Sequence, residues 1–251
     1  MKLVDFAKNR KCDTIEKDRY EIPMRLLLLA MMGVSLYFAV RGGEKLVVSR
    51  QVEAPEKTRQ CVVVDAGHGG MDPGKVSVDG SLEKDINLQI AQKLKKFLEL
   101  EDVEVILTRD SDSGLYDESA SNKKVQDMKN RVDVIEGNKP RLTVSIHQNS
   151  YHEEYVHGAQ TFYYKGSTES SRLAERIQQT MVLDLDPDNT RQAKANDSYY
   201  LLKKTSTPIV IVECGFLSNY EEAQKLASDY YQEKVAWANH LGILQYLNSC
   251  E

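Results

Sequence analysis

The sequence predicts an α/β fold in which helices cover the faces of a sheet. From Gln60 onward, short apolar segments alternate with amphipathic segments, a pattern typical of this fold. The chain has 251 residues, enough for one sizeable domain or two small ones. An uncharged run near the N-terminus precedes the alternating pattern and needs a separate interpretation.

The strands are expected where short apolar runs occur, and the helices where apolar residues recur at helical spacing. Ser81 is the expected N-cap of the first helix, and the polar stretch 110–121 is expected to be a loop. The expected strands are 61–66, 103–108, 142–147, 159–164 and 208–212. The expected helices are 86–100, 125–135, 171–183, 220–228 and 230–247.

Composition excludes several classes of protein. The 33 basic and 38 acidic residues give a net charge of −5, so no cationic excess is present to neutralise a nucleic-acid backbone. The four cysteines are too few for a disulfide-stapled scaffold and include no Cys-x-x-Cys pair. Stability must therefore come from burial of apolar side chains, and nucleic acid is not an expected partner.

Residues 26–40 carry no charge and lie between Arg25 and Arg41. These 15 residues are fewer than the ~20 of an untilted membrane span, which fits a signal-peptide core or a short anchor; a buried helix is the alternative. The preceding 25 residues are long for the start of a signal peptide and hold seven basic and five acidic residues. That length favours an uncleaved anchor with a cytoplasmic N-terminus.

Four segments are therefore expected along the chain. They are a cytoplasmic segment 1–25, a signal anchor or uncleaved signal sequence 26–40, a polar linker 41–59 and a catalytic domain 60–251. From Arg41 onward the chain holds 26 basic and 33 acidic residues, a net charge of −7. Cys61, Cys214 and Cys250 would lie outside the membrane and Cys12 inside, which allows at most one internal disulfide.

Four polar residues fall at one edge of the expected sheet. His68, His147 and Glu213 each lie at the carboxyl end of an expected strand, and Glu83 begins the first helix. In open α/β sheets this edge is where ligands bind. Two histidines and one carboxylate form a catalytic zinc set that leaves a position for water, whose pKa zinc lowers toward ~7. Glu213 then remains to move protons as general base and acid.

Each of these residues also has an ordinary structural interpretation. His68 fits a turn between glycines, and Glu83 is a carboxylate favoured by the helix dipole. Glu213 is harder to explain in this way, because a carboxylate that follows a buried strand is costly unless it is paired or faces a cleft. His152 and His157, in YHEEYVHG, lack the spacing of the HExxH motif and are expected in a loop.

Four segments, VVVDAGHGGMDPG, SLEKDINL, SIHQNS and IVECGFLSN, resemble the signature segments of the zinc-dependent N-acetylmuramoyl-L-alanine amidases. The resemblance covers residues 60–247. It implies a twisted, mostly parallel sheet of about six strands with helices on both faces. It also implies that His68, Glu83 and His147 bind one zinc ion and that Glu213 is the catalytic acid and base. Such enzymes cleave the amide between N-acetylmuramic acid and L-alanine in peptidoglycan.

Two further segments, HGAQTFYY and NDSYYLLKKTSTPIVIVECGFLSN, together with the expected anchor, resemble the CwlD type of germination-specific amidase of spore-formers. That resemblance implies a membrane-anchored enzyme on the cortex side of the forespore membrane. There it would remove stem peptides from spore cortex before muramic-δ-lactam forms. A lipoprotein of the GerS type that supports zinc loading is implied as a partner.

Three residues are expected near the substrate, and two rival functions stay open. Arg109 and Arg131 are candidate contacts for carboxylates of the stem peptide, and Asn149 is a candidate for substrate binding. Solvated arginines and a capped strand end are the alternatives. Cys214 is expected to be a packed thiol and not a nucleophile. The rivals are a zinc peptidase that cuts within the stem peptide and a non-catalytic peptidoglycan-binding or scaffold protein.

Overall fold

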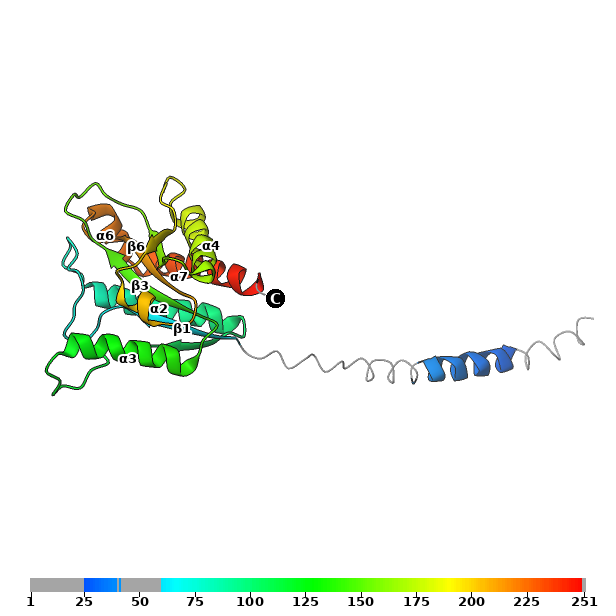
Figure 1. Ribbon diagram of the computed structural model, residues 1–251. Helices are drawn as coiled ribbons and strands as arrows, with labels where there is room; N and C mark the ends of the chain where they lie inside the picture. Colours follow the sequence, from blue (N-terminus) through cyan, green and yellow to red (C-terminus); the bar gives the residue numbers. More distant parts are fainter. Residues whose placement is uncertain (1–24, 40, 42–59, 250–251) are drawn as a thin grey trace, which may run out of the picture. The chain divides into compact units, whose positions relative to one another are not determined.

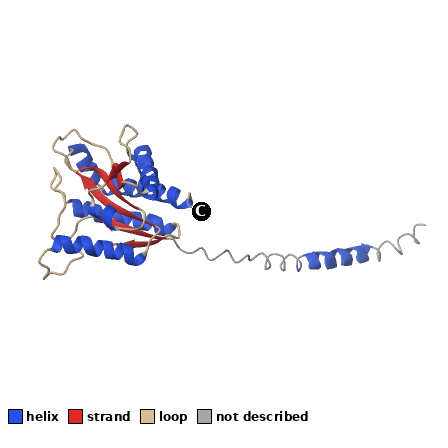
Figure 2. Cartoon of the chain, in the orientation of Figure 1, coloured by secondary structure: helices blue, strands red, loops and turns tan. Residues whose placement is uncertain are grey.

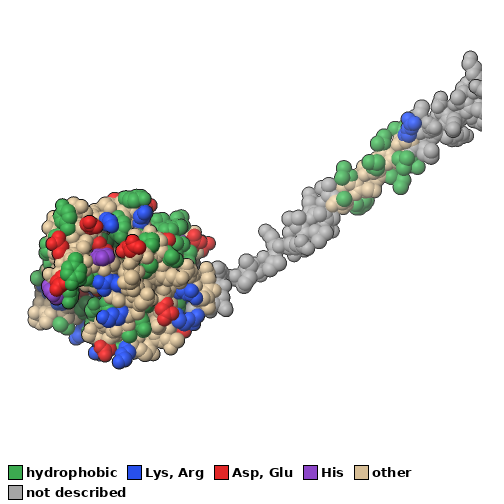
Figure 3. Space-filling model, turned by 90° about the horizontal axis from the view of Figure 1, so that it is seen from above, with side chains coloured by type: hydrophobic (Ala, Val, Ile, Leu, Met, Phe, Trp, Pro, Cys, Tyr) green, Lys and Arg blue, Asp and Glu red, His purple; other side chains and the backbone are tan. Residues whose placement is uncertain are grey.

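The computed structural model describes residues 25–39, 41 and 60–249. The chain divides into two compact units, Met1–Thr58 and Arg59–Glu251. In the first unit, residues 25–39 are helical and expose their apolar side chains, as the coloured stretch between grey segments in Figure 3 shows. Among the described residues, no helix is long and apolar enough to span a membrane. Most of the expected segments 1–25 and 41–59 lies outside the described residues.

The second unit is built on a six-stranded sheet with the order β2-β1-β3-β6-β4-β5. β2, β1, β3 and β6 run parallel to one another. β4 runs antiparallel to β6, and β5 runs parallel to β4. The prediction of a mostly parallel sheet of about six strands is therefore confirmed. The strands are β1 (Cys61–Ala66), β2 (Glu104–Leu107), β3 (Leu142–Asn149), β4 (Gln160–Tyr164), β5 (Lys194–Asn196) and β6 (Ile209–Phe216).

Helices cover both faces of this sheet (Figures 1 and 2). α2 and α4 pack on one face with α7 across them, whereas α3 and α5 pack on the other. Alternate residues of β1 serve the two cores, since Val62 and Val64 face α2 while Val63 faces α3. The helices are α2 (Glu83–Leu100), α3 (Lys123–Asn138), α4 (Thr168–Leu185), α5 (Tyr200–Lys204), α6 (Tyr220–Ala227) and α7 (Asp229–Asn248).

The structure differs from the sequence expectation at five places. β5 and α5 were not expected, because segments of three and five residues are too short to show a period. β3 and β6 continue beyond the expected ends, to Asn149 and Phe216. Ser81 is not the N-cap of α2. Loop carbonyls cap that helix instead, since Lys75 accepts from the N–H of Glu83 at 2.9 Å and Pro73 from that of Lys84 at 3.2 Å.

A buried ion pair joins the end of β1 to α3. Asp65 is fully buried, and its Oδ1 lies 2.6 Å from Nη1 of Arg131. Thr108 and Ser145 also donate to this carboxylate, at 2.7 and 2.5 Å. Burial by itself would raise the pKa of Asp65, but Arg131 and the two hydroxyl donors hold it at about 2. The carboxylate is therefore ionised in the folded protein at neutral pH.

We expect Asp65→Asn to lower the free energy of unfolding by about 3 kcal/mol at pH 7, because it removes one partner of a buried pair. The folded-state pKa of Asp65, about 2, lies below the ordinary 3.8, so its contribution is complete above pH ~4 and is lost as the pH falls toward ~2. Urea unfolding of the unmodified protein and of Asp65→Asn should therefore show that the difference in their free energies of unfolding shrinks by roughly 2 kcal/mol on acidification. A difference in free energy of unfolding that does not change with pH would contradict this account.

The contact between α4 and α7 depends on Gly242. A Cβ atom at this position would lie 2.6 Å from the Cα of Ile177, a backbone atom that cannot move aside easily. We expect Gly242→Ala to lower the free energy of unfolding by about 1–3 kcal/mol through overpacking. Gly137 in α3 is the matched control, because a Cβ there meets nothing within 4 Å. Gly137→Ala should be neutral or stabilising by up to about 1 kcal/mol, and thermal unfolding compares the two.

Candidate active site

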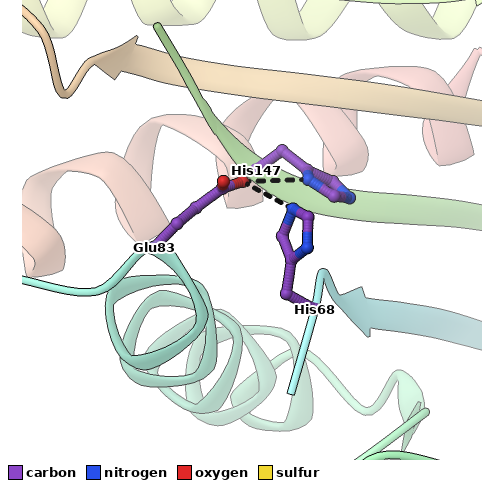
Figure 4. A group of neighbouring side chains, drawn as sticks. All are labelled: His68, Glu83 and His147. Atoms are coloured by element: carbon purple, nitrogen blue, oxygen red, sulfur yellow. Dashed lines mark hydrogen bonds and ion pairs between the residues drawn. The ribbon is translucent and has the colours of Figure 1, made fainter. Parts of the chain in front are cut away.

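Three side chains from different elements converge at the carboxyl edge of the sheet (Figure 4). Glu83 is the first residue of α2, His68 lies in the loop after β1, and His147 lies on β3. Glu83 Oε1 is 3.2 Å from Nε2 of His68 and 3.1 Å from Nδ1 of His147. One ligand atom from each residue lies within 4.8 Å of the other two. The structure thus brings together the three residues that the sequence suggested as metal ligands.

Glycines allow the loop after β1 to approach these ligands. His68 itself has a positive φ of 61°, which places its side chain on an unusual turn. A Cβ at Gly67 would lie 2.3 Å from the ring of His147, and one at Gly74 would lie 2.5 Å from Glu83 Oε2. Any side chain at either position would displace a candidate ligand. This close approach explains why the sequence surrounds His68 with glycine.

The carboxylate of Glu83 is held by donors on both oxygens. The backbone N–H of Gln148 donates to Oε1 at 3.1 Å, and that of Lys75 donates to Oε2 at 2.8 Å. Burial opposes ionisation, but the hydrogen bonds and charges of His147 and His68 lower the pKa of Glu83 well below its usual range. Burial likewise disfavours the charge on His147, while Glu83 raises the pKa of that imidazole. The cluster therefore offers an ionised carboxylate beside two imidazoles.

The spacing of the cluster fits a zinc ion. Zinc binds imidazole nitrogen and carboxylate oxygen at about 2.0–2.2 Å in tetrahedral geometry, which puts neighbouring ligand atoms about 3.4 Å apart. The two contacts of Glu83 Oε1, at 3.1 and 3.2 Å, are close to that value. Two imidazoles and one carboxylate are also the donor set of a catalytic site with an open position.

Asp72 is a candidate functional residue that the sequence analysis missed. Its Oδ2 lies 3.1 Å from Nδ1 of His68, and its Oδ1 accepts from the backbone N–H of Gly74 at 3.2 Å. A carboxylate on the second ring nitrogen fixes the orientation and tautomer of a metal-binding histidine. The available signal was an aspartate four residues after His68 within the glycine-rich segment.

Glu213 lies beside the cluster on the neighbouring strand. It is the register partner of His147 across β3 and β6, and its side chain is largely buried, at 8% exposure. Its Oε1 accepts from the Tyr199 hydroxyl at 3.5 Å, whereas Oε2 is buried and finds no partner among the described residues. Burial raises the pKa of Glu213 to about 7. This is the range in which a carboxylate both accepts and returns protons at neutral pH.

Tyr199 was also missed in the sequence. It precedes the short helix α5, which has no periodic pattern to reveal it. Burial, followed by the charge of Glu213, raises the pKa of Tyr199 to about 12. The hydroxyl therefore stays protonated and donates to Glu213.

A cavity of about 630 Å³ opens in front of these residues. His68, His147, Glu213 and Ile211 are among the residues that line it. The first turns of α3, the polar loop before α3 and the start of α5 complete the walls. The loop 110–121, which the sequence predicts to border the cleft, lines the cavity through Tyr116 and Ala120.

The structure gives the two arginines roles different from the expected contact with substrate carboxylates. Arg109 is buried at 4% exposure and donates to backbone carbonyls of Ala66, Gly67, Ser111 and Lys84 at 2.7–3.0 Å. Arg131 borders the cavity but is committed to Asp65, Asp127 and two carbonyls. Both guanidinium groups brace the loop that carries His68. Each of them directs four N–H donors to groups of the protein itself.

The remaining candidates lie outside the metal cluster. Asn149 ends β3, and its side-chain oxygen accepts from the N–H of Ser150 at 2.8 Å, as in the strand-end capping alternative. His152 and His157 lie in the loop after β3, as expected, and contact Glu153 and the Tyr155 carbonyl.

The cysteines within the described part of the chain do not form a disulfide. Cys61 and Cys214 are free thiols, and Cys214 is fully buried behind Glu213. Burial raises the pKa of the Cys214 thiol, as expected for a packed side chain. Cys12 and Cys250 lie outside the described residues.

The chain is similar to known amidases in sequence and in structure. The family model for N-acetylmuramoyl-L-alanine amidase matches residues 62–245. The germination-specific N-acetylmuramoyl-L-alanine amidase of Bacillus subtilis (strain 168) is 37% identical over 190 residues, or 74% of this chain and 79% of that protein. The solved CwlD amidase of Clostridioides difficile, in complex with the GerS lipoprotein, is 42% identical with a TM-score of 0.74, and the match covers 76% of this chain and all of that one.

A second solved structure, the amidase AmiC2 of Nostoc punctiforme, is 33% identical with a TM-score of 0.66 over 75% of this chain and 97% of that one. The matched residues span the whole sheet and the converging His68, Glu83, His147 and Glu213. The chain therefore belongs to the N-acetylmuramoyl-L-alanine amidase family.

Proposed function

We propose that this protein hydrolyses the amide bond between N-acetylmuramic acid and L-alanine in peptidoglycan, with one zinc ion held by His68, Glu83 and His147. The unpartnered Oε2 of Glu213 carries the proposal, because a buried carboxylate oxygen without a donor fits a group that receives a proton from a ligand in the cavity. The family match supports the choice of the bond.

In this mechanism Glu213 carries out both proton transfers, first as general base and then as general acid. Zinc, when bound, supplies Lewis acidity that makes water nucleophilic near neutral pH and polarises the carbonyl under attack. Glu213 Oε2 takes the proton from the attacking water and returns it to the L-alanine nitrogen as the amide bond breaks. The Tyr199 hydroxyl, on Oε1, orients the carboxylate and leaves Oε2 without a donor from the described part of the chain. Asp72 holds the imidazole of His68 in place.

We further propose a role in spore cortex, where removal of stem peptides precedes formation of muramic-δ-lactam. The likeness to a germination-specific amidase supports this substrate. The likeness to a CwlD amidase solved with a GerS lipoprotein supports a lipoprotein partner of that type. The catalytic domain, residues 60–251, would then work outside the cytoplasm on the cortex side of the forespore membrane.

Residues 26–40 are proposed as the signal anchor or uncleaved signal sequence that holds the domain there. Support comes from the described helical part, where Leu29 and Phe38 are 64% and 67% exposed and no charged residue interrupts the run. So many exposed apolar side chains are stabilised when lipid covers them.

We expect the full-length protein, incubated with cortex peptidoglycan and zinc, to release stem peptides that begin with L-alanine and to leave unsubstituted muramic acid. A chelator should abolish the reaction. Glu213→Gln should lower kcat by roughly 10²–10⁴-fold, the range of general acid–base catalysis, while zinc still binds. Mass spectrometry of the fragments and metal analysis of the protein check these outcomes.

Glu221→Gln is the matched control, since this exposed carboxylate of α6 lies outside the cavity lining and should leave kcat unchanged. Cleavage between residues of the stem would indicate the peptidase. Binding without turnover would indicate a scaffold. Full activity of Glu213→Gln would refute the assigned role of Glu213.

The proposed anchor, residues 26–40, can be tested by membrane association. Full-length protein expressed in a spore-former should sediment with membranes and resist alkaline carbonate. Leu29→Arg, which places a charge inside the apolar run, should shift it to the soluble fraction. Leu183→Arg in α4, at a similarly exposed leucine of the second unit, should have no such effect. Intact N-terminal sequence on the membrane form would show that the segment is not cleaved.

A further inference from the structure

The first turn of α3 carries positive charge where a helix favours negative charge. Its first two residues are Lys123 and Lys124, and the turn contains no acid. The helix dipole makes this placement unfavourable, because the N-terminal end of a helix is already positive. Both lysines border the cavity in front of the candidate zinc site. A local arrangement that opposes helix stability beside an active site is expected to serve binding.

Lys124 lies close to the candidate metal ligands. Its Nζ is 3.1 Å from Oδ2 of Asp72, and the same oxygen is 3.1 Å from Nδ1 of His68. Because the two contacts share this oxygen, the ammonium lies no more than about 6.2 Å from Nδ1. An extended peptide advances about 3.3–3.6 Å per residue, so this distance corresponds to about two residues of a bound substrate.

The ammonium of Lys124 remains available for a ligand. Its side chain is 72% exposed, and Asp72 is the partner recorded for it, which leaves N–H donors for another acceptor. Asp72 would not be left unsatisfied if Lys124 turned away, because His68 and the N–H of Gly74 still donate to it. The exposed pair therefore costs little to open.

The other cations around the cavity are more firmly committed. Arg131 is paired with Asp65 and Asp127 in the protein interior. Lys123 is paired with Glu118, lies over the ring of Tyr116, and is 23% exposed. Lys124 is thus the cavity-lining cation with the most accessible charge.

We propose that Lys124 binds a free carboxylate of the stem peptide, within about two residues of the scissile amide. This proposal rests on the proposed function and names the part of the substrate that the cavity recognises. The chain from Arg41 onward carries a net charge of −7, so an anionic peptide needs a local cation to be held. The ion pair with substrate would replace the contact between Lys124 and Asp72, and Asp72 would keep its contacts with His68 and Gly74.

Binding of the released stem peptide tests the proposal without requiring turnover. Calorimetry would compare zinc-loaded full-length protein with its Lys124→Ala and Lys124→Arg variants, using the stem peptide and the same peptide with amidated side-chain carboxylates. We expect Lys124→Ala to weaken binding of the free-acid peptide roughly tenfold, in line with a lost charged hydrogen bond. The amidated peptide should bind all three proteins equally weakly, and Lys124→Arg should retain most of the affinity.

Lys129→Ala is the matched control, because this exposed lysine of the same helix lies outside the cavity lining. Zinc affinity, measured by competition with a chelator, should be the same in Lys124→Ala and the unmodified protein. An equal loss of affinity for the free-acid and the amidated peptide in Lys124→Ala, or weakened zinc binding, would overturn the proposal. Lys124 would then serve only to position Asp72. Lys124-dependent peptide binding by a protein that cleaves nothing would uphold this subsite and refute the proposed function instead.

Discussion

The site depends on one buried guanidinium. Arg131 reaches from α3 to Asp65 at the end of β1, and it also donates to the carbonyls of Ala66 and His68 at 2.8 and 2.6 Å. The chain leaves the sheet at this point, so its carbonyl groups lack strand partners and require donors from elsewhere. Arg131 supplies donors to two of them and also balances the charge of Asp65. Arg109 donates to the carbonyls of Ala66 and Gly67. The loop that presents His68 is therefore fixed to both the sheet and α3.

Sequence reasoning succeeded where residues carry a local signature. Long apolar segments predicted the sheet and the major helices, and polar residues at strand ends predicted His68, Glu83, His147 and Glu213 as neighbours. Each of these inferences uses a rule that links sequence position to place in an α/β fold. The structure adds that β3 and β6 are neighbours in the sheet and that His147 and Glu213 are register partners across them.

Other features could not be predicted because their cause is tertiary. Arg109 was expected to contact substrate, yet it donates to backbone carbonyls that only the folded loops bring together. Ser81 has the residue type of an N-cap, but a loop passing the start of α2 takes that role. Tyr199 reaches Glu213 from a helix of five residues, too short for periodicity to indicate.

The absence of side chains at Gly67 and Gly74 has a consequence for recognising related sequences. A Cβ at Gly67 would collide with His147, and a Cβ at Gly74 would collide with Glu83. The two glycines therefore leave the space that the ligand side chains occupy, whereas the ligands determine which ion can bind. A search pattern limited to ligand types would accept chains whose loop cannot close around the ion. A pattern that also requires glycine on both sides of His68, at this spacing, selects for the shape of the site itself.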